Sequence, residues 1–223
     1  MKAAARVLIA GLLAAVAACA RRQEAPKAYD AKSTYEYLQD VGRVRAQSNA
    51  DNKERIPAMI RNRDLVMLGT QSARTEDYKR ALAALPTAGV DPDALLFAKN
   101  FEAILDSYRS VCMDAAELFR ELQAANARPS APAVVLPPVR FGTEAYQTDT
   151  IGTVDSLLES LDRLDTGART GTVALQPIIG KLRVDRDSLR AAKVAHHDFS
   201  VKLKATLAQR YPGRDWNAKE ILP

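Results

Sequence analysis

His196, His197 and Asp198 are consecutive residues near the C-terminal end of the chain, and their types come closest to a catalytic or metal-binding group. An imidazole titrates near neutral pH, so a histidine here could act as a general base or a pH-dependent switch. Adjacent residues of a helix point about 100° apart, however, so the two rings are not placed to chelate one ion. Only His196 lies on the apolar side of its segment. The sequence therefore favours a core or half-buried His196 and a solvated His197, with a ligand or switch role for His196 as the sharper alternative.

Cys112 is the other residue whose side chain could take part in a reaction. It flanks a run of regularly spaced apolar residues, and a thiol in such a position is usually buried and inert. Its neighbours Val111, Met113 and Asp114 supply no positive charge that would lower its pKa. Cys112 could instead border a ligand cavity together with His196. Since the only other cysteine is Cys19, we expect no internal disulfide.

The sequence lacks the motifs that accompany catalysis or metal binding in helical proteins. Glu-x-x-His, Cys-x-x-Cys-His, His-Glu-x-x-His and Gly-x-Ser-x-Gly are absent, as are phosphate-binding and calcium-binding loops. Asp185 is eleven residues before His196, a separation of about 16 Å along a helix that rules out a catalytic pair. We therefore expect no cofactor and no metal site, and enzymatic activity is the least favoured function.

The first nineteen residues have the composition of an export signal. Lys2 and Arg6 supply positive charge, an apolar run follows over residues 7–16, and small residues lead to Cys19. This order is typical of a secretory signal. The apolar run is shorter than the roughly 20 residues that a membrane-spanning helix needs. We expect residues 1–18 to be removed as a signal peptide.

The segment Val16-Ala17-Ala18-Cys19 resembles the lipobox of bacterial lipoproteins. The resemblance implies that the Cys19 sulfur carries a diacylglycerol and that Cys19 is the first residue of the mature protein. Attachment would then be through lipid chains, each buried CH₂ contributing about 0.8 kcal/mol. In enteric members of this class, a residue other than Asp after the cysteine, here Ala20, is typical of an outer-membrane location. We expect a lipid-anchored cell-envelope protein, at the outer membrane and facing the periplasm in a Gram-negative host.

The charge of the mature chain is small and evenly spread. The formal net charge is +5, and loss of Lys2 and Arg6 with the signal lowers it to +3. The chain is 47% hydrophobic and 26% charged, which is ordinary for a folded domain. It has no basic stripe with interleaved aromatic residues, so we expect no nucleic-acid partner.

The mature chain has the pattern of a series of amphipathic helices. The clearest begins at Asp91-Pro92-Asp93. A capping carboxylate, a proline at the first helical position and a second acid in the first turn each indicate a helix N-terminus there. Apolar residues then recur at alternating steps of four and three as far as Leu122, which is the spacing of a bundle seam. A second long helix is predicted from Leu175 to about Arg210. Shorter helices are predicted after Ser33, after Asp51, after Thr75 and over residues 153–164.

These elements predict a mainly α fold: an elongated antiparallel helical bundle with two long helices and shorter packing helices. A helix of about 36 residues measures about 54 Å, more than the roughly 43 Å diameter of a compact domain of this size. Residues 128–140 are Pro-rich and should cross between helices in extended form. Trp216 either packs back on the bundle or anchors a partner. We divide the chain into a signal peptide (1–18), a lipidated tether (19–32), a bundle domain (33–211) and a C-terminal tail (212–223).

Two binding functions remain open beside the disfavoured enzyme. The leading hypothesis is a structural or protein-interaction module whose long helical faces bind another envelope protein. The alternative is a small-ligand or lipid-binding periplasmic bundle with a core cavity near His196 and Cys112. A cavity lined by His196 would favour the second hypothesis, and a large exposed apolar stripe would favour the first.

Overall fold

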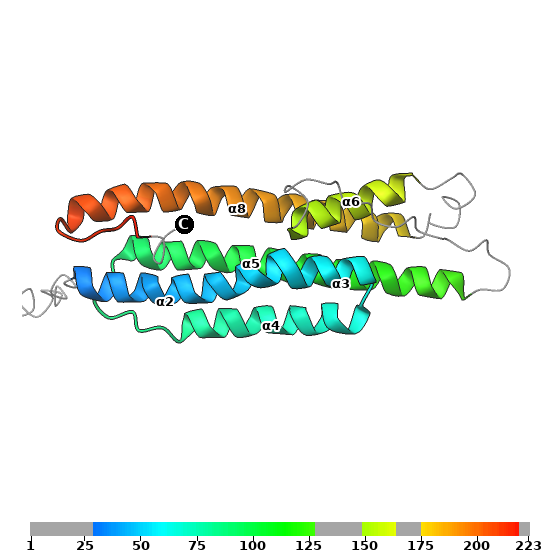
Figure 1. Cartoon of the computed structure of the whole chain (residues 1–223), viewed down its shortest axis with the longest axis horizontal. Helices are drawn as coiled ribbons and strands as arrows, with labels where there is room; N and C mark the ends of the chain where they lie inside the picture. The colour runs from blue at the N-terminus through cyan, green and yellow to red at the C-terminus, as the bar shows by residue number, and fades with distance from the viewer. Residues whose placement is uncertain (1–28, 128–148, 164–174, 219–223) are drawn as a thin grey trace, which may run out of the picture.

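The computed structural model of the chain describes residues 29–127, 149–163 and 175–218, and in these ranges it contains helices and no strand. The mainly α fold class is therefore confirmed. Figure 1 shows the helices running along one long axis. In chain order the helical elements are α2 (Ala31–Ala50), the π-helical turn η1 (Asp51–Arg55), α3 (Ile56–Asn62), α4 (Leu65–Ala83), α5 (Pro92–Asn126), α6 (Thr150–Asp162) and α8 (Gln176–Arg210).

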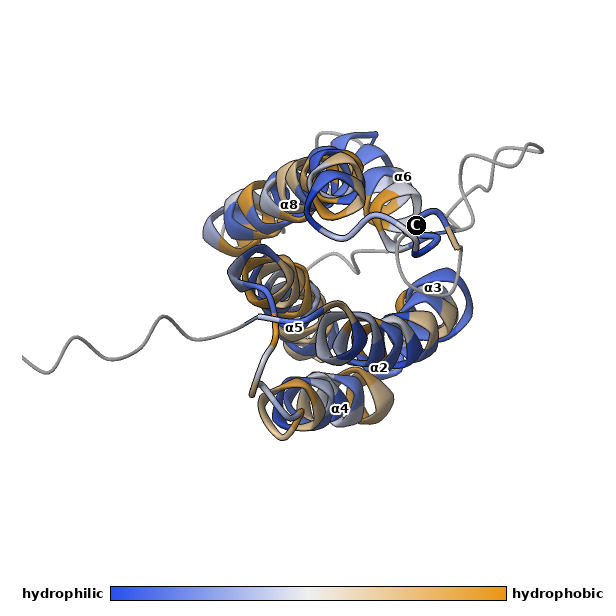
Figure 2. Ribbon diagram, turned by 90° about the vertical axis from the view of Figure 1, so that its left-hand side faces the viewer, coloured by the Kyte–Doolittle hydropathy of each residue, from blue (hydrophilic) through white to orange (hydrophobic). Residues whose placement is uncertain are grey.

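The helices are arranged in three layers, which Figures 1 and 2 show from two directions. Helices α8 and α6 form one layer, α5 lies beside α2 and α3 in the middle layer, and α4 covers the other side. The two 35-residue helices α5 and α8 run antiparallel and pack along most of their length. Their contact places the apolar residues of both seams in one core, where Phe97, Leu118 and Leu189 are fully buried.

The long helices match their predictions because their sequence signals are strong. The Asp91 side chain accepts a hydrogen bond from the backbone N–H of Asp93 and caps α5, whose first residue is Pro92. The Asp91 carboxylate also accepts from Arg210 Nη1 (2.8 Å) and Tyr211 Oη (3.0 Å). These bonds join the start of α5 to the end of α8.

The shorter helices differ from their predictions at their ends. Helix α2 is capped by Asp30, whose side chain accepts from Ser33 N, so Ser33 is inside the helix and is not its cap. No break occurs at residues 49–52, because the π-helical turn η1 continues α2 into α3. Helix α4 begins after its cap Asp64 and not at Thr75. Met67 is 42% exposed, and Leu68 is the buried residue there.

The C-terminal tail returns to the bundle. Trp216 is 1% exposed and lies against Tyr35 and Tyr211, at ring-centroid distances of 5.8 and 5.9 Å. Its indole N–H donates to the carbonyl oxygen of Tyr211. Trp216 is therefore a core residue, and the alternative that it anchors a partner is wrong. Residues 1–18, which are predicted to form a signal peptide, lie outside the described residues, as do Cys19 and the Pro-rich segment 128–140.

Candidate functional site

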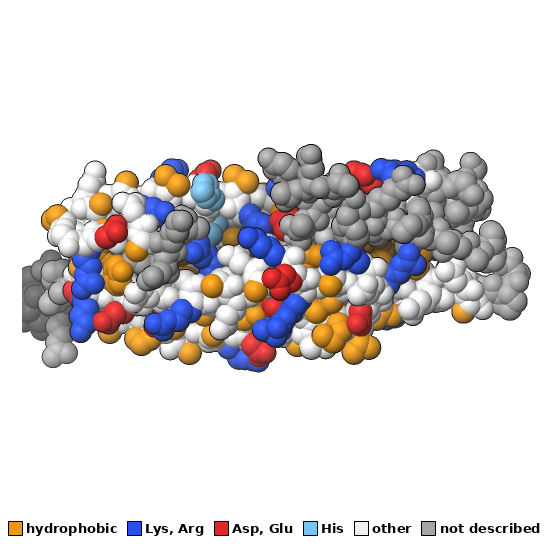
Figure 3. Space-filling view, in the orientation of Figure 1, with side chains coloured by type: hydrophobic (Ala, Val, Ile, Leu, Met, Phe, Trp, Pro, Cys, Tyr) orange, Lys and Arg blue, Asp and Glu red, His pale blue; other side chains and the backbone are white. Residues whose placement is uncertain are grey.

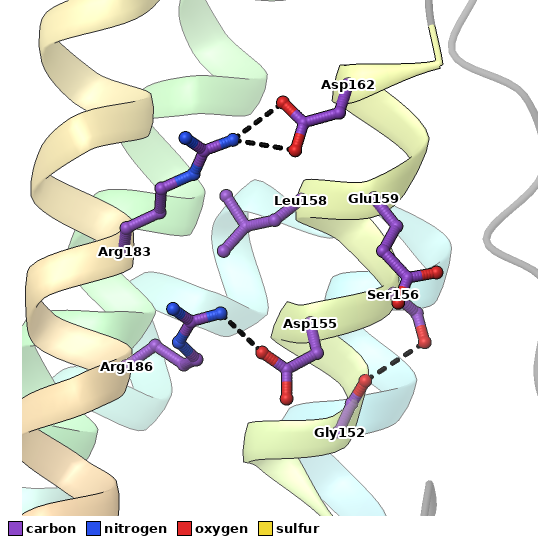
Figure 4. Close-up of a pocket in the computed structure, with 8 residues that line it drawn as sticks. All are labelled: Gly152, Asp155, Ser156, Leu158, Glu159, Asp162, Arg183 and Arg186. Carbon is purple, nitrogen blue, oxygen red and sulfur yellow. Dashed lines mark hydrogen bonds and ion pairs between the residues drawn. The ribbon is translucent and has the colours of Figure 1, made fainter.

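Two cavities border α8, and they differ in how their charged side chains are paired. The larger, about 390 Å³, lies between α6 and α8 (Figure 4). Arg183 on α8 donates to both oxygens of Asp162 on α6, at 2.6 and 2.8 Å, and Arg186 pairs with Asp155. Leu158 lies between the two ion pairs. Because both cations of this groove already have carboxylate partners, the groove is a clamp between two helices rather than a site that needs a ligand.

The smaller cavity, about 170 Å³, lies where α2, α5 and α8 meet, and we call it the His196 cavity. It is lined by Arg45 and Asn49 from α2, by Phe101, Ile104 and Tyr108 from α5, and by Lys193, His196 and His197 from α8. In Figure 3 the histidine atoms lie on the α8 side of the molecule, and Lys and Arg side chains lie between them and the middle layer.

The heptad spacing of α8 places His196 in the bundle core. His196 lies seven residues after Leu189 and seven before Leu203, and both leucines are buried. Its imidazole is 5% exposed and stacks on Phe97, with ring centroids 4.3 Å apart and an interplanar angle of 28°. Phe101 lies on the ring at 5.7 Å. The structure thus places this polar ring between aromatic side chains of α5.

Neither nitrogen of the His196 ring has a hydrogen-bond partner among the described residues. A neutral imidazole carries one donor and one acceptor, and each buried polar group without a partner costs about 1–3 kcal/mol. Burial lowers the pKa of His196 to about 4, and the nearby positive charges of Arg45 and His197 act in the same direction. At neutral pH, His196 is therefore an uncharged ring with unused hydrogen-bonding capacity.

Arg45 brings a second unpartnered polar group to the same cavity. Its Nε is buried without a hydrogen-bond partner, and the guanidinium has no ion pair with any residue that the structure describes. Burial lowers the pKa of Arg45 below its usual value. An arginine remains charged even so, and a charge withdrawn from water is costly unless an opposite charge is nearby.

Lys193 and Tyr108 complete the edge of the cavity. Lys193 Nζ forms an ion pair with Asp149 Oδ2 at 2.9 Å, which links α8 to the N-cap of α6. Tyr108 is 3% exposed, and burial raises the pKa of its phenol. Among the described residues no carboxylate lines the cavity, so the charged side chains that they place at its wall are cations.

Cys112 is buried on α5, one helical turn after Tyr108, and does not line the His196 cavity. Burial raises the pKa of its thiol to about 12, and the charge of Asp51 adds to this effect. The thiol is therefore protonated at neutral pH, and a thiol in that state is a poor nucleophile. His196 and Cys112 were predicted to border one cavity, but only His196 does so.

Asp114 is a second buried titratable group on α5, and α8 supplies its partners. Lys181 Nζ donates to Asp114 Oδ1, whereas Oδ2 has no partner when Asp114 is a carboxylate. As a carboxylic acid, Asp114 can donate from Oδ2 to the adjacent Asp185. Burial and the interaction with Asp185 raise the pKa of Asp114 to about 6.

The described residues contain no group of three or more His, Cys, Asp or Glu side chains placed to hold a metal ion. Within the same ranges, no helix combines the length and the apolar composition needed to cross a bilayer. Comparisons with known proteins give no match: no family model, no curated protein and no solved structure is significantly similar to this chain.

Sequence reasoning found His196 as a polar residue on an apolar stripe but missed Arg45. A signal for Arg45 exists in the sequence. Arg43 and Arg55 each have an acid one turn away, Asp40 and Asp51, with which they form ion pairs. The residues one turn from Arg45 are Val41, Gly42, Ser48 and Asn49, none of which is acidic.

Proposed function

We propose that this protein is a lipid-anchored component of the cell envelope whose helical bundle binds a small ligand in the His196 cavity. The observation that carries the proposal is that His196 and Arg45, two residues that line an existing cavity, have buried polar atoms without partners among the described residues. Folded proteins satisfy nearly all buried polar groups, so each exception calls for an explanation. A bound ligand would supply the missing hydrogen bonds.

The proposed anchor is the lipid on Cys19, and it rests on the resemblance of residues 16–19 to a lipobox. Because α2 begins at Ala31, a short segment would separate this anchor from the bundle. A Cys19→Ala variant should lose labelling by radioactive palmitate and should leave the membrane fraction. A Cys112→Ala variant is the matched control and should keep both. Continued fatty-acid labelling of Cys19→Ala would contradict the proposed anchor.

Ligand binding can be tested with a library of small fragments and the full-length mature protein in a non-ionic detergent. Fragments that bind in the cavity should raise the unfolding temperature of the native protein and of Asp198→Asn, which changes an exposed residue of α8 outside the cavity lining. They should fail to stabilise His196→Phe, which fills the site with an apolar ring. Ligand binding in the cavity would be refuted by fragments that stabilise His196→Phe as well as the native protein.

A structural or protein-interaction module remains the second candidate function, because one observation favours it. Val184, Val194 and Val201 are 63%, 57% and 55% exposed on the outer face of α8. Residues ten and seven positions apart lie within about 100° of one another on a helix. A photo-crosslinking residue at Val194 should capture an envelope protein if this face binds a partner, whereas one at Asp77 on α4 should not.

A further inference from the structure

The charges around the His196 cavity indicate which class of ligand it takes. The charged side chains that the described residues place at its wall include the cations Arg45 and Lys193 and no carboxylate. Lys193 is paired with Asp149, whereas Arg45 has no ion pair with a described residue, so Arg45 brings one positive charge for a ligand to match. A single charge of this kind is matched by a monoanion, whereas a phosphate dianion would bring more negative charge than the site can balance.

The hydrogen-bonding groups favour the same class of ligand. Arg45 Nε is a donor, a neutral His196 ring carries one further donor, and neither has an acceptor among the described residues. These nitrogens are closed to solvent, so a carboxylate bonds to them only after the guanidinium and the imidazole turn toward the cavity. A carboxylate has two oxygens that accept hydrogen bonds, and its bonds with a guanidinium are among the stronger ones in proteins. A neutral ligand could satisfy the donors but would leave the charge of Arg45 uncompensated.

The remaining wall of the cavity is apolar and limits the size of the ligand. Phe101, Ile104 and Tyr108 of α5 form this part of the wall. The volume of about 170 Å³ is below the roughly 300–1,000 Å³ that is usual for drug-sized ligands. This volume suits a single ring or a short aliphatic chain.

We infer that the His196 cavity binds a small monocarboxylate, with its carboxylate on Arg45 and His196 and its ring or short chain against Phe101, Ile104 and Tyr108. The inference rests on the proposed ligand-binding function and adds the chemical class of the ligand. It also assigns Arg45 as the residue that selects for a negative charge.

The test compares charged and neutral probes of the same shape on the full-length mature protein in a non-ionic detergent. Benzoate, benzamide, hexanoate and inorganic phosphate are titrated to about 10 mM by calorimetry, which is ten times the Kd of a millimolar complex. Benzoate or hexanoate should bind at least about tenfold more tightly than benzamide, and phosphate should bind more weakly than either acid.

Two variants on the same helix separate the cavity from general electrostatic attraction. Arg45→Met keeps the length of the side chain but removes its charge, so it should weaken carboxylate binding by about tenfold or more. Arg43→Met removes an exposed arginine that is paired with Asp40, and it should bind the carboxylates as the native protein does. Circular dichroism of both variants shows whether they are folded, and Arg45→Lys should recover part of the affinity.

The outcomes distinguish this inference from the proposed function on which it rests. If benzamide binds as tightly as benzoate and Arg45→Met binds both, the cavity takes neutral ligands and the inference about charge is wrong, while ligand binding stands. Preferential binding of phosphate would likewise overturn the monocarboxylate and keep an anion site. If none of the four probes binds to the native protein, both the inference and the ligand-binding function are contradicted.

Discussion

Asp51 and His196 are both polar residues buried in the same bundle, and their surroundings differ completely. Asp51 is 2% exposed in the turn η1, where its carboxylate accepts from Gln71 Nε2 at 2.9 Å and from Tyr78 Oη at 2.6 Å. Arg55 and Arg74 form ion pairs with it at 3.2 and 3.0 Å. His196 is as deeply buried and has no hydrogen-bond partner among the described residues.

This difference distinguishes a buried polar residue that holds helices together from one that we propose binds a ligand. The groups around Asp51 join α2, η1 and α4 and leave no hydrogen-bonding capacity for a ligand. The groups around His196 and Arg45 enclose a cavity with that capacity unused. Burial of a polar residue alone therefore does not indicate a binding site. We propose that the absence of partners among the described residues, together with space for a ligand, does.

The largest effect is expected from Asp51→Ala. The change leaves the buried Tyr78 hydroxyl and Gln71 amide without their acceptor, so it should lower the free energy of unfolding by about 3–5 kcal/mol. Urea denaturation measures this loss. Asp40→Ala breaks an exposed pair with Arg43 and should change stability by about 0.5 kcal/mol or less. If the two substitutions lower the free energy of unfolding equally, Asp51 contributes no more to stability than a surface carboxylate does.

The next largest effect is the pH dependence of the free energy of unfolding that His196 causes. The His196 ring lies against Phe97 and Phe101 of α5. Arg45 of α2 and Lys193 and His197 of α8 line the same cavity. The pKa of His196 is lowered to about 4 in the folded protein, from 6.5. Its contribution to stability is therefore complete above pH 6.5 and is lost as the pH falls towards 4, by about 3 kcal/mol. His196→Phe cannot take up this proton. Relative to the native protein, the variant should gain about 3 kcal/mol from pH 6.5 to 4.

Asp114 supplies a control of opposite sign for that experiment. Its folded pKa is raised to about 6, so its contribution to stability is complete below 3.8 and is lost as the pH rises through 6. Asp114→Asn should therefore lose stability relative to the native protein as the pH is lowered from 6.5 to 4. Urea unfolding across this range measures both differences. A His196→Phe difference that stays constant with pH would show that His196 is not a buried neutral imidazole.

A smaller effect is expected from Arg45→Met in the absence of ligand. Replacing an unpaired, partly buried charge with an apolar side chain should raise the free energy of unfolding by about 1 kcal/mol. For a domain of this size the unfolding temperature should rise by about 2–4 °C. Arg43→Met should leave it unchanged within about 1 °C, because an exposed ion pair contributes little. A loss of stability in Arg45→Met would indicate that Arg45 has a structural partner.

The smallest effect is expected from alkylation at Cys112. Its buried thiol has a pKa of about 12, so iodoacetamide at pH 8 should leave Cys112 unmodified in the folded protein and modify it fully in urea. Mass spectrometry of the peptide that contains Cys112 measures the difference. Rapid modification of the folded protein would mean that the His196 cavity extends as far as Cys112.

The sequence was sufficient for the parts of the fold where several local signals agree. Helix α5 has a capping acid, a proline at its start and an unbroken apolar seam, and both of its ends were close to prediction. The start of α4 was missed because its single capping residue, Asp64, precedes exposed apolar residues such as Val66 and Met67. The turn η1 has no sequence signature, because an added residue per turn depends on how α2 and α3 pack.

Only part of the candidate site could be predicted, because its residues come from different helices. The position of His196 on an apolar heptad seam can be read from α8 alone. Its cavity depends on Arg45, which comes from another helix more than a hundred residues earlier in the chain. Local periodicity places a side chain on one face of its own helix, but it does not say which faces meet.

We propose that a carboxylate binds to the unpartnered groups of His196 and Arg45. The most direct measurement is a ¹⁵N NMR titration of the two histidine side chains of the full-length mature protein, with and without benzoate, using His197→Gln for assignment. A carboxylate beside His196 should shift its ring nitrogens and raise its pKa from about 4, while His197 changes little. If benzoate leaves the resonances and the pKa of His196 unchanged, the cavity does not receive the anion and the account is contradicted.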